Sequence, residues 1–496
     1  MNPAVATHTL ILGLGRSGVA MARWCARSGG QITVADTRPK PPELSALMTE
    51  VPTACFVHSE MDTNLLARGR FDRVLKSPGL SPQLVSAVMT AAKADSIPCG
   101  NELSLFAEAL GALKTDRAYA PQIIGITGTN GKTTVTALTG KLIGDAGKSV
   151  AVAGNIGPSL LETLASRLDA EALPEVWVLE LSSFQLDGVE NFEPSVATVL
   201  NITQDHLDWH GSLAAYAEAK SRVYGQGQRL LNRDDALVMR GAPPLLKGKP
   251  VRAYLSFGLD EPQRPGDYGL ESVNGMTWLV RALEADETIR RKKGEESVLH
   301  IQRLMPADAL RIRGRHNAVN ALAALALAVA VGCAMAPLLH GLRDYRGEPH
   351  RVESIATLDA VEYFDDSKGT NVGATVAALT GLGAERRLVL IAGGDGKGQD
   401  FSPLADPVLR FVRAVVLIGR DAPALGAALG GTGVPLFFAD SLPAAVVLAA
   451  QHAQAGDAVL MSPACASLDM FDNYEHRARV FVEAVQALAL DRGVLS

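Results

Sequence analysis

The chain has 496 residues, of which 47% are apolar and 20% are charged. At roughly 150 residues per domain this length gives about three domains with a core each, and the composition excludes a disordered protein or a fibre. The formal net charge of −6 comes from 53 acidic and 47 basic residues, which argues against a nucleic-acid-binding protein and favours small-molecule ligands.

Targeting signals are weak along the chain. The five cysteines are widely separated and form no Cys-x-x-Cys or zinc-type cluster, which favours a reducing cytoplasm. The N-terminus lacks the basic start of a signal peptide. The apolar stretch 321–336 would span about 24 Å as a helix, less than the ~30 Å hydrocarbon core. We therefore expect a cytoplasmic protein with no membrane insertion, in which this stretch is a buried helix ended by Pro337.

Short β-branched segments alternate with alanine-rich segments of helical pattern, and this alternation predicts an α/β fold with parallel strands. The first set of predicted strands begins with 8–12 and 31–35, and the second includes 122–127, 176–181 and 195–202. A third set predicts a doubly wound sheet of its own, with strands at 361–364, 387–392, 414–418, 434–438 and 458–461.

Proline and glycine near residues 97–100 and 345–349 predict two domain boundaries. The predicted domains are 1–99, 100–347 and 348–496. Between Gly225 and Pro306, proline and glycine clusters interrupt the α/β pattern, and we interpret this region as a surface insertion. Its basic run at 290–293 is followed by two glutamates, which is typical of a solvated face.

The first glycine cluster is Gly13-Leu14-Gly15-Arg16-Ser17-Gly18, directly after a strand, and Asp36 ends the next strand. This spacing matches the dinucleotide fingerprint, in which a helix N-terminus approaches a diphosphate and the acid binds a ribose hydroxyl. Taken alone it suggests NAD. A UDP-sugar, or a tight turn without a ligand, are the alternatives.

A second loop, Gly128-Thr129-Asn130-Gly131-Lys132-Thr133-Thr134, lies between a predicted strand and a predicted helix. Backbone N–H groups, a lysine and a hydroxyl in this order suit the phosphates of ATP and a bound Mg²⁺. The general P-loop pattern is not met, because Ile126 stands at the position of its first glycine.

Polar side chains follow other strands of the second set. Glu180 ends a buried strand beside the phosphate loop, where we favour metal binding over a structural role. The segment Asn201–His210 holds four potential ligands, but no complementary cluster elsewhere supports a metallohydrolase. Lys220 has no role that its local sequence reveals. Asn317 and Asn320 share a helix face and suit either a cap or an adenine edge.

In the third set, loops 365–371, 392–398 and 461–469 each follow a strand. The carboxyl ends of parallel strands meet at one edge of a sheet, so we expect these loops to converge on an anionic substrate. Cys465, in the last loop, is interpreted as a structural thiol because no histidine lies near it in sequence.

Together these motifs resemble those of the Mur ligases of bacterial cell-wall synthesis, over the whole chain. The family-wide motifs are residues 128–133, Gly154-Asn155-Ile156-Gly157, His316-Asn317 with Asn320, and residues 366–371. Segments 76–79, 179–186, 393–397 and 462–468 are similar to those of the family members that add D-glutamate to UDP-N-acetylmuramoyl-L-alanine.

The resemblance implies three domains: a Rossmann-like domain for UDP, a central P-loop ATPase-like domain with a mostly parallel sheet, and a C-terminal Rossmann-like domain for D-glutamate. Uridine diphosphate then replaces NAD as the expected ligand of the glycine cluster. The implied UDP-substrate contacts are Arg16, Ser17, Asp36, Thr37, Arg38, Ser77, Gly79, Asn155 and His206. The implied ATP contacts are Gly128, Thr129, Asn130, Gly131, Lys132, Thr133, Thr134, Asn317, Asn320, Arg351 and Asp366. The implied D-glutamate contacts are Lys368, Thr370, Lys397, Ser467, Leu468 and Tyr474.

The same resemblance implies two Mg²⁺ ions, with Mn²⁺ as an alternative, and a carbamate formed on Lys220 from CO₂. The implied metal residues are Thr133, Glu180, His206 and carbamylated Lys220, and the implied catalytic residues are Lys132, Glu180, His206, Lys220 and Lys368. ATP would activate the alanine carboxylate as an acyl phosphate, which D-glutamate attacks to form an amide. A monomer is implied, with closure of the C-terminal domain over ATP.

Two departures from the family pattern stand out. Tyr474 occurs where a phenyl ring is expected, which adds a hydroxyl near the D-glutamate residues. The region from Gly225 to Pro306 is longer than the family minimum and has no implied role.

Overall fold

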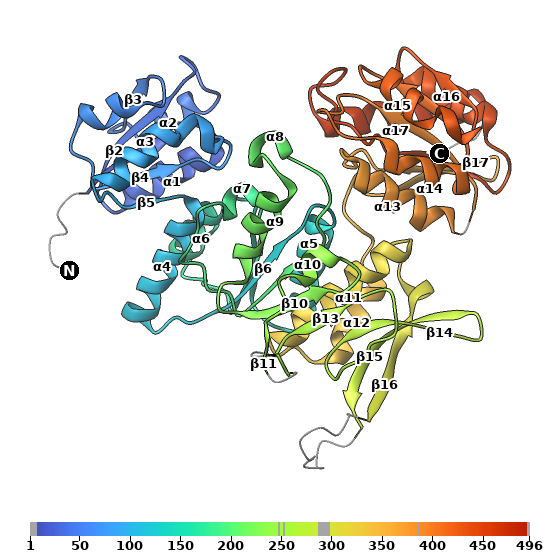
Figure 1. Cartoon of the computed structure of the whole chain (residues 1–496), viewed down its shortest axis with the longest axis horizontal. Coiled ribbons are helices and arrows are strands. Elements are labelled where there is room, and N and C mark those ends of the chain that lie inside the picture. The colour runs from blue at the N-terminus through green and yellow to red at the C-terminus, as the bar shows by residue number, and fades with distance from the viewer. Residues whose placement is uncertain (1–6, 247–248, 251–252, 286–297, 385, 494–496) are drawn as a thin grey trace. The chain divides into compact units, whose positions relative to one another are not determined.

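The computed structural model describes residues 7–246, 249–250, 253–285, 298–384 and 386–493. Figure 1 shows the chain coloured from its N-terminus to its C-terminus. The chain divides into two compact units. The first unit comprises Met1–Ile202, His206–Phe257 and Ala323–Leu338, and the second comprises Thr203–Asp205, Gly258–Leu322 and Leu339–Ser496. The basic run 290–293 lies outside the described residues. The two predicted domain boundaries stay a prediction.

The N-terminal part of the first unit is a five-stranded parallel sheet in the order β3-β2-β1-β4-β5. Leu10 and Leu12 of β1 pack in one apolar cluster and Ile11 in another, so the sheet is covered on both faces. This arrangement confirms the predicted Rossmann-like domain. Its strands are β1 His8–Leu12, β2 Gln31–Asp36, β3 Cys55–His58, β4 Arg73–Lys76 and β5 Cys99–Gly100. Its helices are α1 Arg16–Arg27, α2 Leu44–Glu50, η1 Thr63–Arg68 and α3 Pro82–Ala94.

A second parallel sheet of the first unit has the strand order β7-β8-β6-β9-β10-β13. Its strands are β6 Gln122–Thr127, β7 Val150–Gly154, β8 Val176–Glu180, β9 Val196–Val199, β10 Gln228–Asn232 and β13 Leu255–Phe257. Helix α4 Glu102–Arg117 precedes the first of these strands, and the helices between them are α5 Lys132–Asp145, α6 Leu160–Asp169, α7 Ser183–Leu186, α8 Leu207–His210, α9 Leu213–Ser221, η2 Arg222–Tyr224 and α10 Ala236–Met239. The short strands β11 Leu245–Leu246 and β12 Lys249–Pro250 form a separate antiparallel pair.

The interpretation of residues 225–306 as a surface insertion is wrong for part of that region. Strand β10 pairs in parallel with β9 and β13, and Leu230, Leu231 and Phe257 are buried in this sheet. The remainder, in the second unit, is an antiparallel sheet of β14 Tyr268–Val273, β15 Met276–Glu284 and β16 Leu299–Pro306, followed by η3 Ala307–Ala309. Proline and glycine clusters lie in the connections of this region. They made the short strands between them difficult to predict from the sequence.

The predicted helix over 321–336 begins and ends elsewhere. Helix α11 covers Arg315–Ala330 and ends before Gly332, whose φ of +83° is the left-handed conformation common after a helix C-terminus. Pro337 lies instead in the first turn of α12 Met335–Asp344, where a missing N–H costs nothing. Among the described residues, no helix combines the length and the apolar composition that a membrane crossing requires.

The C-terminal part of the second unit is a six-stranded sheet in the order β17-β18-β22-β19-β20-β21. Its parallel strands, β18 Val361–Asp365, β19 Leu388–Gly393, β20 Val412–Ile418, β21 Leu436–Phe438 and β22 Ala458–Met461, confirm the predicted doubly wound sheet. Strand β17 Glu353–Leu358, an antiparallel edge strand, was not predicted. The helices are α13 Val372–Gly383, η4 Ser402–Leu404, α14 Ala405–Phe411, α15 Ala422–Leu429, η5 Gly430–Thr432, α16 Leu442–His452 and α17 Tyr474–Asp491.

Candidate active site

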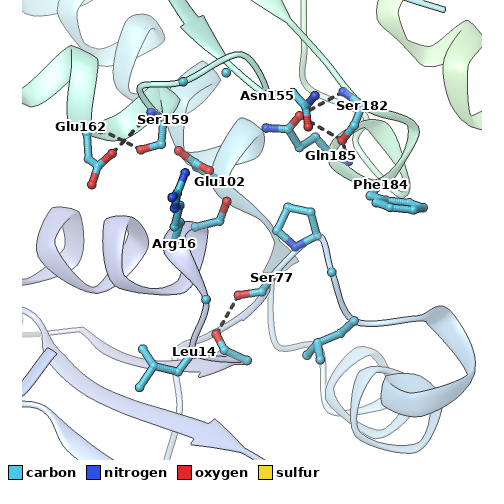
Figure 2. A pocket seen from close by; sticks show the side chains of 18 of the residues that line it. Leu14, Arg16, Ser77, Glu102, Asn155, Ser159, Glu162, Ser182, Phe184 and Gln185 are labelled. Atoms are coloured by element: carbon cyan, nitrogen blue, oxygen red, sulfur yellow. Dashed lines mark hydrogen bonds between the residues drawn. The ribbon is translucent and has the colours of Figure 1, made fainter. Parts of the chain in front are cut away.

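A cavity of about 630 Å³ lies between the glycine cluster after β1 and the loop after β7. Figure 2 shows residues from both segments facing it. Eight of the nine predicted UDP-substrate residues line this cavity: Arg16, Ser17, Asp36, Thr37, Arg38, Ser77, Gly79 and Asn155. The ninth, His206, is not among the residues that line the cavity. The centre of its ring lies 4.7 Å from the ring centre of Phe184, which does line the cavity. The structure therefore brings eight of the nine predicted UDP-substrate residues together at one cavity.

Asp36 differs from the acid of a dinucleotide fingerprint. Its side chain is 3% exposed, and both of its oxygens accept hydrogen bonds from Arg38, at 2.9 Å from Nε and 2.8 Å from Nη2. The backbone N–H of Leu14 also donates to Oδ2 at 2.7 Å. Burial alone would raise the pKa of Asp36, but these hydrogen bonds lower it to about 2. The carboxylate thus holds Arg38 and the glycine turn rather than offering two free oxygens to a ribose.

The phosphate loop joins β6 to α5. Gly131, at the N-terminal end of α5, has a φ of +82°, a conformation that favours glycine. A Cβ at Gly128 would lie 3.0 Å from Leu200 Cβ, so a side chain there would crowd the neighbouring strand end. Lys132 folds back over the loop, and its Nζ donates to the carbonyls of Gly128 and Thr129 at 2.8 Å each. Lys132 is therefore held over its own loop by the carbonyls of that loop.

Asn201 clamps this loop, a role that the sequence did not reveal. Its Oδ1 accepts from the backbone N–H of Asn130 at 2.8 Å, and its Nδ2 donates to the Asn130 carbonyl at 3.0 Å. The backbone N–H of Thr129 donates to the Asn201 carbonyl at 2.9 Å. The segment after β9 therefore fixes the loop after β6, because these strands are neighbours.

Two charged side chains are buried in this part of the first unit: Glu180, which ends strand β8, and Lys220, which lies in helix α9. Glu180 is 1% exposed; its Oε1 accepts from Asn155 Nδ2 at 2.7 Å, whereas its buried Oε2 has no hydrogen-bond partner in the described part of the chain. Lys220, also 1% exposed, donates from Nζ to the Gly128 carbonyl at 2.8 Å, and this Nζ lies 4.5 Å from the centre of the Tyr216 ring. Lys220, which looked like a surface lysine in sequence, is therefore buried against the phosphate loop.

Close spacing of possible ligand atoms marks a cluster other than the predicted metal residues Glu180 and His206. Within the described ranges, the group of acidic and histidine side chains with three ligand atoms inside 4.8 Å consists of His350, Glu353 and Asp365 in the second unit. Glu180 and His206 are not part of such a group.

The three loops of the C-terminal sheet meet as predicted. The backbone N–H of Ala464 donates to the Gly369 carbonyl at 3.0 Å, which joins the loops after β22 and β18. Asp395 and Ala466 form an antiparallel bridge that joins the loops after β19 and β22. Of the predicted D-glutamate residues, Lys397 and Leu468 are exposed, Ser467 is buried, and Lys368, Thr370 and Tyr474 are half-buried. Lys368 Nζ donates to the Tyr474 hydroxyl at 2.8 Å, so the additional hydroxyl holds the predicted substrate lysine.

Arg477 of α17 holds two of these loops together. This residue was not identified from the sequence. It is 1% exposed and donates to the Ser367 carbonyl at 2.7 Å, the Ser367 hydroxyl at 3.0 Å and the Cys465 carbonyl at 3.1 Å. Burial raises the pKa of the Cys465 thiol to about 12, which supports its structural interpretation.

The remaining predicted ATP residues belong to the second unit. Asn317 Nδ2 donates to the Arg313 carbonyl at 2.8 Å, and Asn320 Nδ2 donates to Asn317 Oδ1 at 3.1 Å, which confirms their shared face. Asp366 is buried and accepts from the Ser462 hydroxyl at 2.6 Å. Burial raises the pKa of Asp366 to about 7, although Ser462 and Arg351 oppose the rise.

Comparison with known proteins identifies three domain families along the chain. Residues 7–99 match the Mur ligase MurD-like N-terminal domain, 126–328 the Mur ligase middle domain, and 350–465 the Mur ligase glutamate ligase domain. The chain is 63% identical to a UDP-N-acetylmuramoylalanine–D-glutamate ligase of Albidiferax ferrireducens, over 99% of this chain and 98% of that protein. A protein of the same name from Burkholderia pseudomallei is 60% identical, over 98% and 97%.

Solved structures support the fold. MurF from Thermotoga maritima in complex with ADP aligns with a TM-score of 0.56 at 16% identity, covering 98% of this chain and 97% of that one. MurC from the same organism aligns with a TM-score of 0.53 at 20% identity, covering 97% and 99%. At this identity the likeness extends to the fold alone.

Proposed function

The chain belongs to the Mur ligase family, and from that membership we propose that it joins D-glutamate to UDP-N-acetylmuramoyl-L-alanine with hydrolysis of ATP to ADP and phosphate. It is a ligase of peptidoglycan precursor synthesis. The observation that carries this function is the identity of 63% over nearly the whole length to a relative named for that reaction. We also propose that it acts as a cytoplasmic monomer.

The UDP end of the substrate is proposed to occupy the 630 Å³ cavity. Arg16 and the N-terminus of α1, where Gly15 has no side chain to cap the helix, supply positive charge for the diphosphate. Arg38, held by Asp36, lines the same cavity. The occupied carboxylate of Asp36 disfavours the rival interpretation as an NAD-dependent oxidoreductase.

ATP is proposed to bind on residues 128–134, with Lys132 exchanging its two loop carbonyls for phosphate oxygens. The reaction must bring an alanine carboxylate up to an anionic triphosphate, and Lys132 and the N-terminus of α5 lower that repulsion. Attack of the carboxylate oxygen on the γ-phosphorus breaks the bond to ADP and forms an acyl phosphate. The D-glutamate amine then forms the amide and releases phosphate.

Some of the predicted metal residues have ligand atoms that suit Mg²⁺, and others do not. The unpartnered Oε2 of Glu180 and the Thr133 hydroxyl are oxygen ligands, which Mg²⁺ prefers, whereas an imidazole such as that of His206 is a weaker choice. Bound Mg²⁺ would supply charge neutralisation at the phosphates.

An ammonium group cannot ligate a metal, so Lys220 contributes only after modification. In the proposed modification the neutral Nζ attacks CO₂, an N–C bond forms, and one proton leaves to solvent. The remaining N–H can still donate to the Gly128 carbonyl, and two new oxygens become available.

D-glutamate is proposed to bind at the three converging loops of the C-terminal sheet. Lys368 and Lys397 are charge partners for its two carboxylates, and Ser467, at the bridge of two of these loops, offers a hydroxyl. Arg477 keeps these loops together without reaching the ligand itself.

The function is tested by measuring phosphate release from ATP in reactions with UDP-N-acetylmuramoyl-L-alanine and D-glutamate, each added or withheld. Release should require both, and L-glutamate should not replace D-glutamate. Release that is independent of either substrate would refute the ligase function. NAD(H) serves as the control for the oxidoreductase alternative, and it should not bind.

A further inference from the structure

Glu102 is a buried carboxyl group in the wall of the UDP-substrate cavity. It is the first residue of α4 and is 1% exposed, yet it lines the cavity, and Figure 2 shows it beside Arg16 and Ser159. Its Oε1 accepts a hydrogen bond from the backbone N–H of Leu161 at 3.2 Å. Its Oε2 is buried and has no hydrogen-bond partner among the residues that the structure describes. An unsatisfied buried oxygen is costly, so a partner that arrives with a ligand would satisfy it.

The polar and charged groups around Glu102 come from two helices, α1 and α6. Arg16 and Ser17 begin α1, and Ser159 and Glu162 begin α6. Glu162 is itself paired with Arg23 at 2.5 Å.

Asp36 and Arg38, which also line the cavity, are paired with each other.

Burial raises the pKa of Glu102, and the charge of Glu162 adds to the rise, whereas Ser17, Ser159 and the Leu161 amide oppose it without cancelling it. The proton therefore stays on Glu102 to a higher pH than on an ordinary glutamate.

We propose that Glu102 binds the diphosphate of the UDP substrate as a neutral carboxylic acid, with Oε2–H donating a hydrogen bond to a phosphate oxygen. A carboxylate at this position would repel the diphosphate and would have no proton to donate, whereas the acid can donate from Oε2, which has no partner among the described residues. Binding at a pH where free Glu102 is ionised then takes up one proton. This proposal rests on the proposed function, because that function puts UDP in this cavity.

The test is the dissociation constant of UDP-N-acetylmuramoyl-L-alanine, measured by titration calorimetry from pH 5.5 to 8.5 without ATP. For the wild type, Kd should rise by up to tenfold per pH unit above the pKa of free Glu102. Calorimetry at pH 7.5 in two buffers of different ionisation enthalpy should detect proton uptake. Glu102→Gln keeps an N–H donor without a titrating proton, so its Kd should be independent of pH and within about threefold of the wild type at pH 5.5.

Glu162→Gln is the matched control, because it changes a second carboxylate that lines the cavity. Its Kd should still rise with pH, and the rise should begin at a lower pH than in the wild type, because the charge of Glu162 no longer raises the pKa of Glu102. A Glu102→Ala variant should bind more weakly at every pH. A flat profile for the wild type, or a sloping profile for Glu102→Gln, would overturn the proposal. If Glu102→Gln does not fold, as judged by circular dichroism, proton uptake by the wild type still decides the matter.

The binding measurement distinguishes a failure of the proposed role of Glu102 from a failure of the proposed function. If the wild type binds the substrate and turns it over but Kd does not change with pH, the role of Glu102 is overturned and the proposed function stands. If the wild type does not bind the substrate at any pH, both are overturned.

Discussion

Lys220 has 1% of its surface exposed, and its Nζ touches the loop proposed to hold ATP. If it supplies metal-binding oxygens as a carbamate, its removal takes away charge stabilisation that no neighbour replaces. We expect Lys220→Ala to lower phosphate release by at least about 100-fold, and excess bicarbonate to restore none of it. Wild-type protein in [¹³C]bicarbonate should show a carbamate carbon resonance that the variant lacks.

A surface lysine provides the control for the Lys220→Ala variant. Lys141 of α5 is paired with Asp145 at 2.5 Å on the same helix that follows the phosphate loop. Lys141→Ala should retain wild-type turnover. Near-normal turnover of Lys220→Ala would contradict the carbamate.

Asp36 makes the first unit sensitive to acid. Its pKa in the folded protein is about 2, below its ordinary 3.8, so the carboxylate stabilises the fold above pH 4, and that contribution is lost as pH falls toward 2. The shift corresponds to about 2 kcal/mol. Asp36→Asn should therefore lower the free energy of unfolding by about 2 kcal/mol at pH 7, measured by urea titration, and by less at pH 3. The exposed Asp116, changed to Asn, should show no such difference; equal losses at both pH values would contradict the assigned hydrogen bonds.

At the scale of single residues, sequence was most informative where a motif restricts side chains to one turn. The eight predicted residues that line the cavity come from such turns. Glu102 and Arg477 were missed because an acid at a helix start and an arginine within a helix are ordinary surface residues in sequence, and only the packing around them makes them buried. Lys220 gained its role from the family resemblance for the same reason.

Among the elements, the phosphate loop depends on a neighbouring strand end. The Asn201 side chain makes two hydrogen bonds to the backbone of Asn130, which are worth about 1–3 kcal/mol together. Asn201→Ala should free the loop and weaken ATP binding by about tenfold in calorimetry, while the Kd of the UDP substrate stays unchanged. As a control, Asn191→Ala removes an amide that donates to the Ser104 carbonyl instead. Unchanged ATP affinity in Asn201→Ala would show that the loop needs no clamp.

The accuracy of the predicted elements followed their length and composition. Strand β6 was predicted to the residue, because its apolar run is bounded by proline on one side and by the phosphate loop on the other. Strand β13 has three residues and β17 lies at a sheet edge, so neither has a strong apolar pattern. The end of α11 was misplaced because the left-handed Gly332 stops a helix as firmly as the proline that follows.

For the whole molecule, the proposed substrates bind on separate sheets. The UDP cavity is built from the first unit alone, and the converging loops proposed for D-glutamate are built from the second. Affinity for one substrate should therefore not depend on the charged residues that hold the other. Chemistry should still need all of them, because the acyl phosphate and the amine must react together.

Two reciprocal variants test this separation. Lys368→Ala removes a cation from a half-buried position, so the KM for D-glutamate should rise by about tenfold or more, while the Kd of the UDP substrate without ATP stays at the wild-type value. Arg38→Ala should give the opposite pattern. If Lys368→Ala weakened both substrates equally, the two anion sites would be coupled even before ATP binds, and the assignment of one substrate to each sheet would fail. Independent losses would instead mean that ATP-dependent chemistry is the step at which the separate sites first act together.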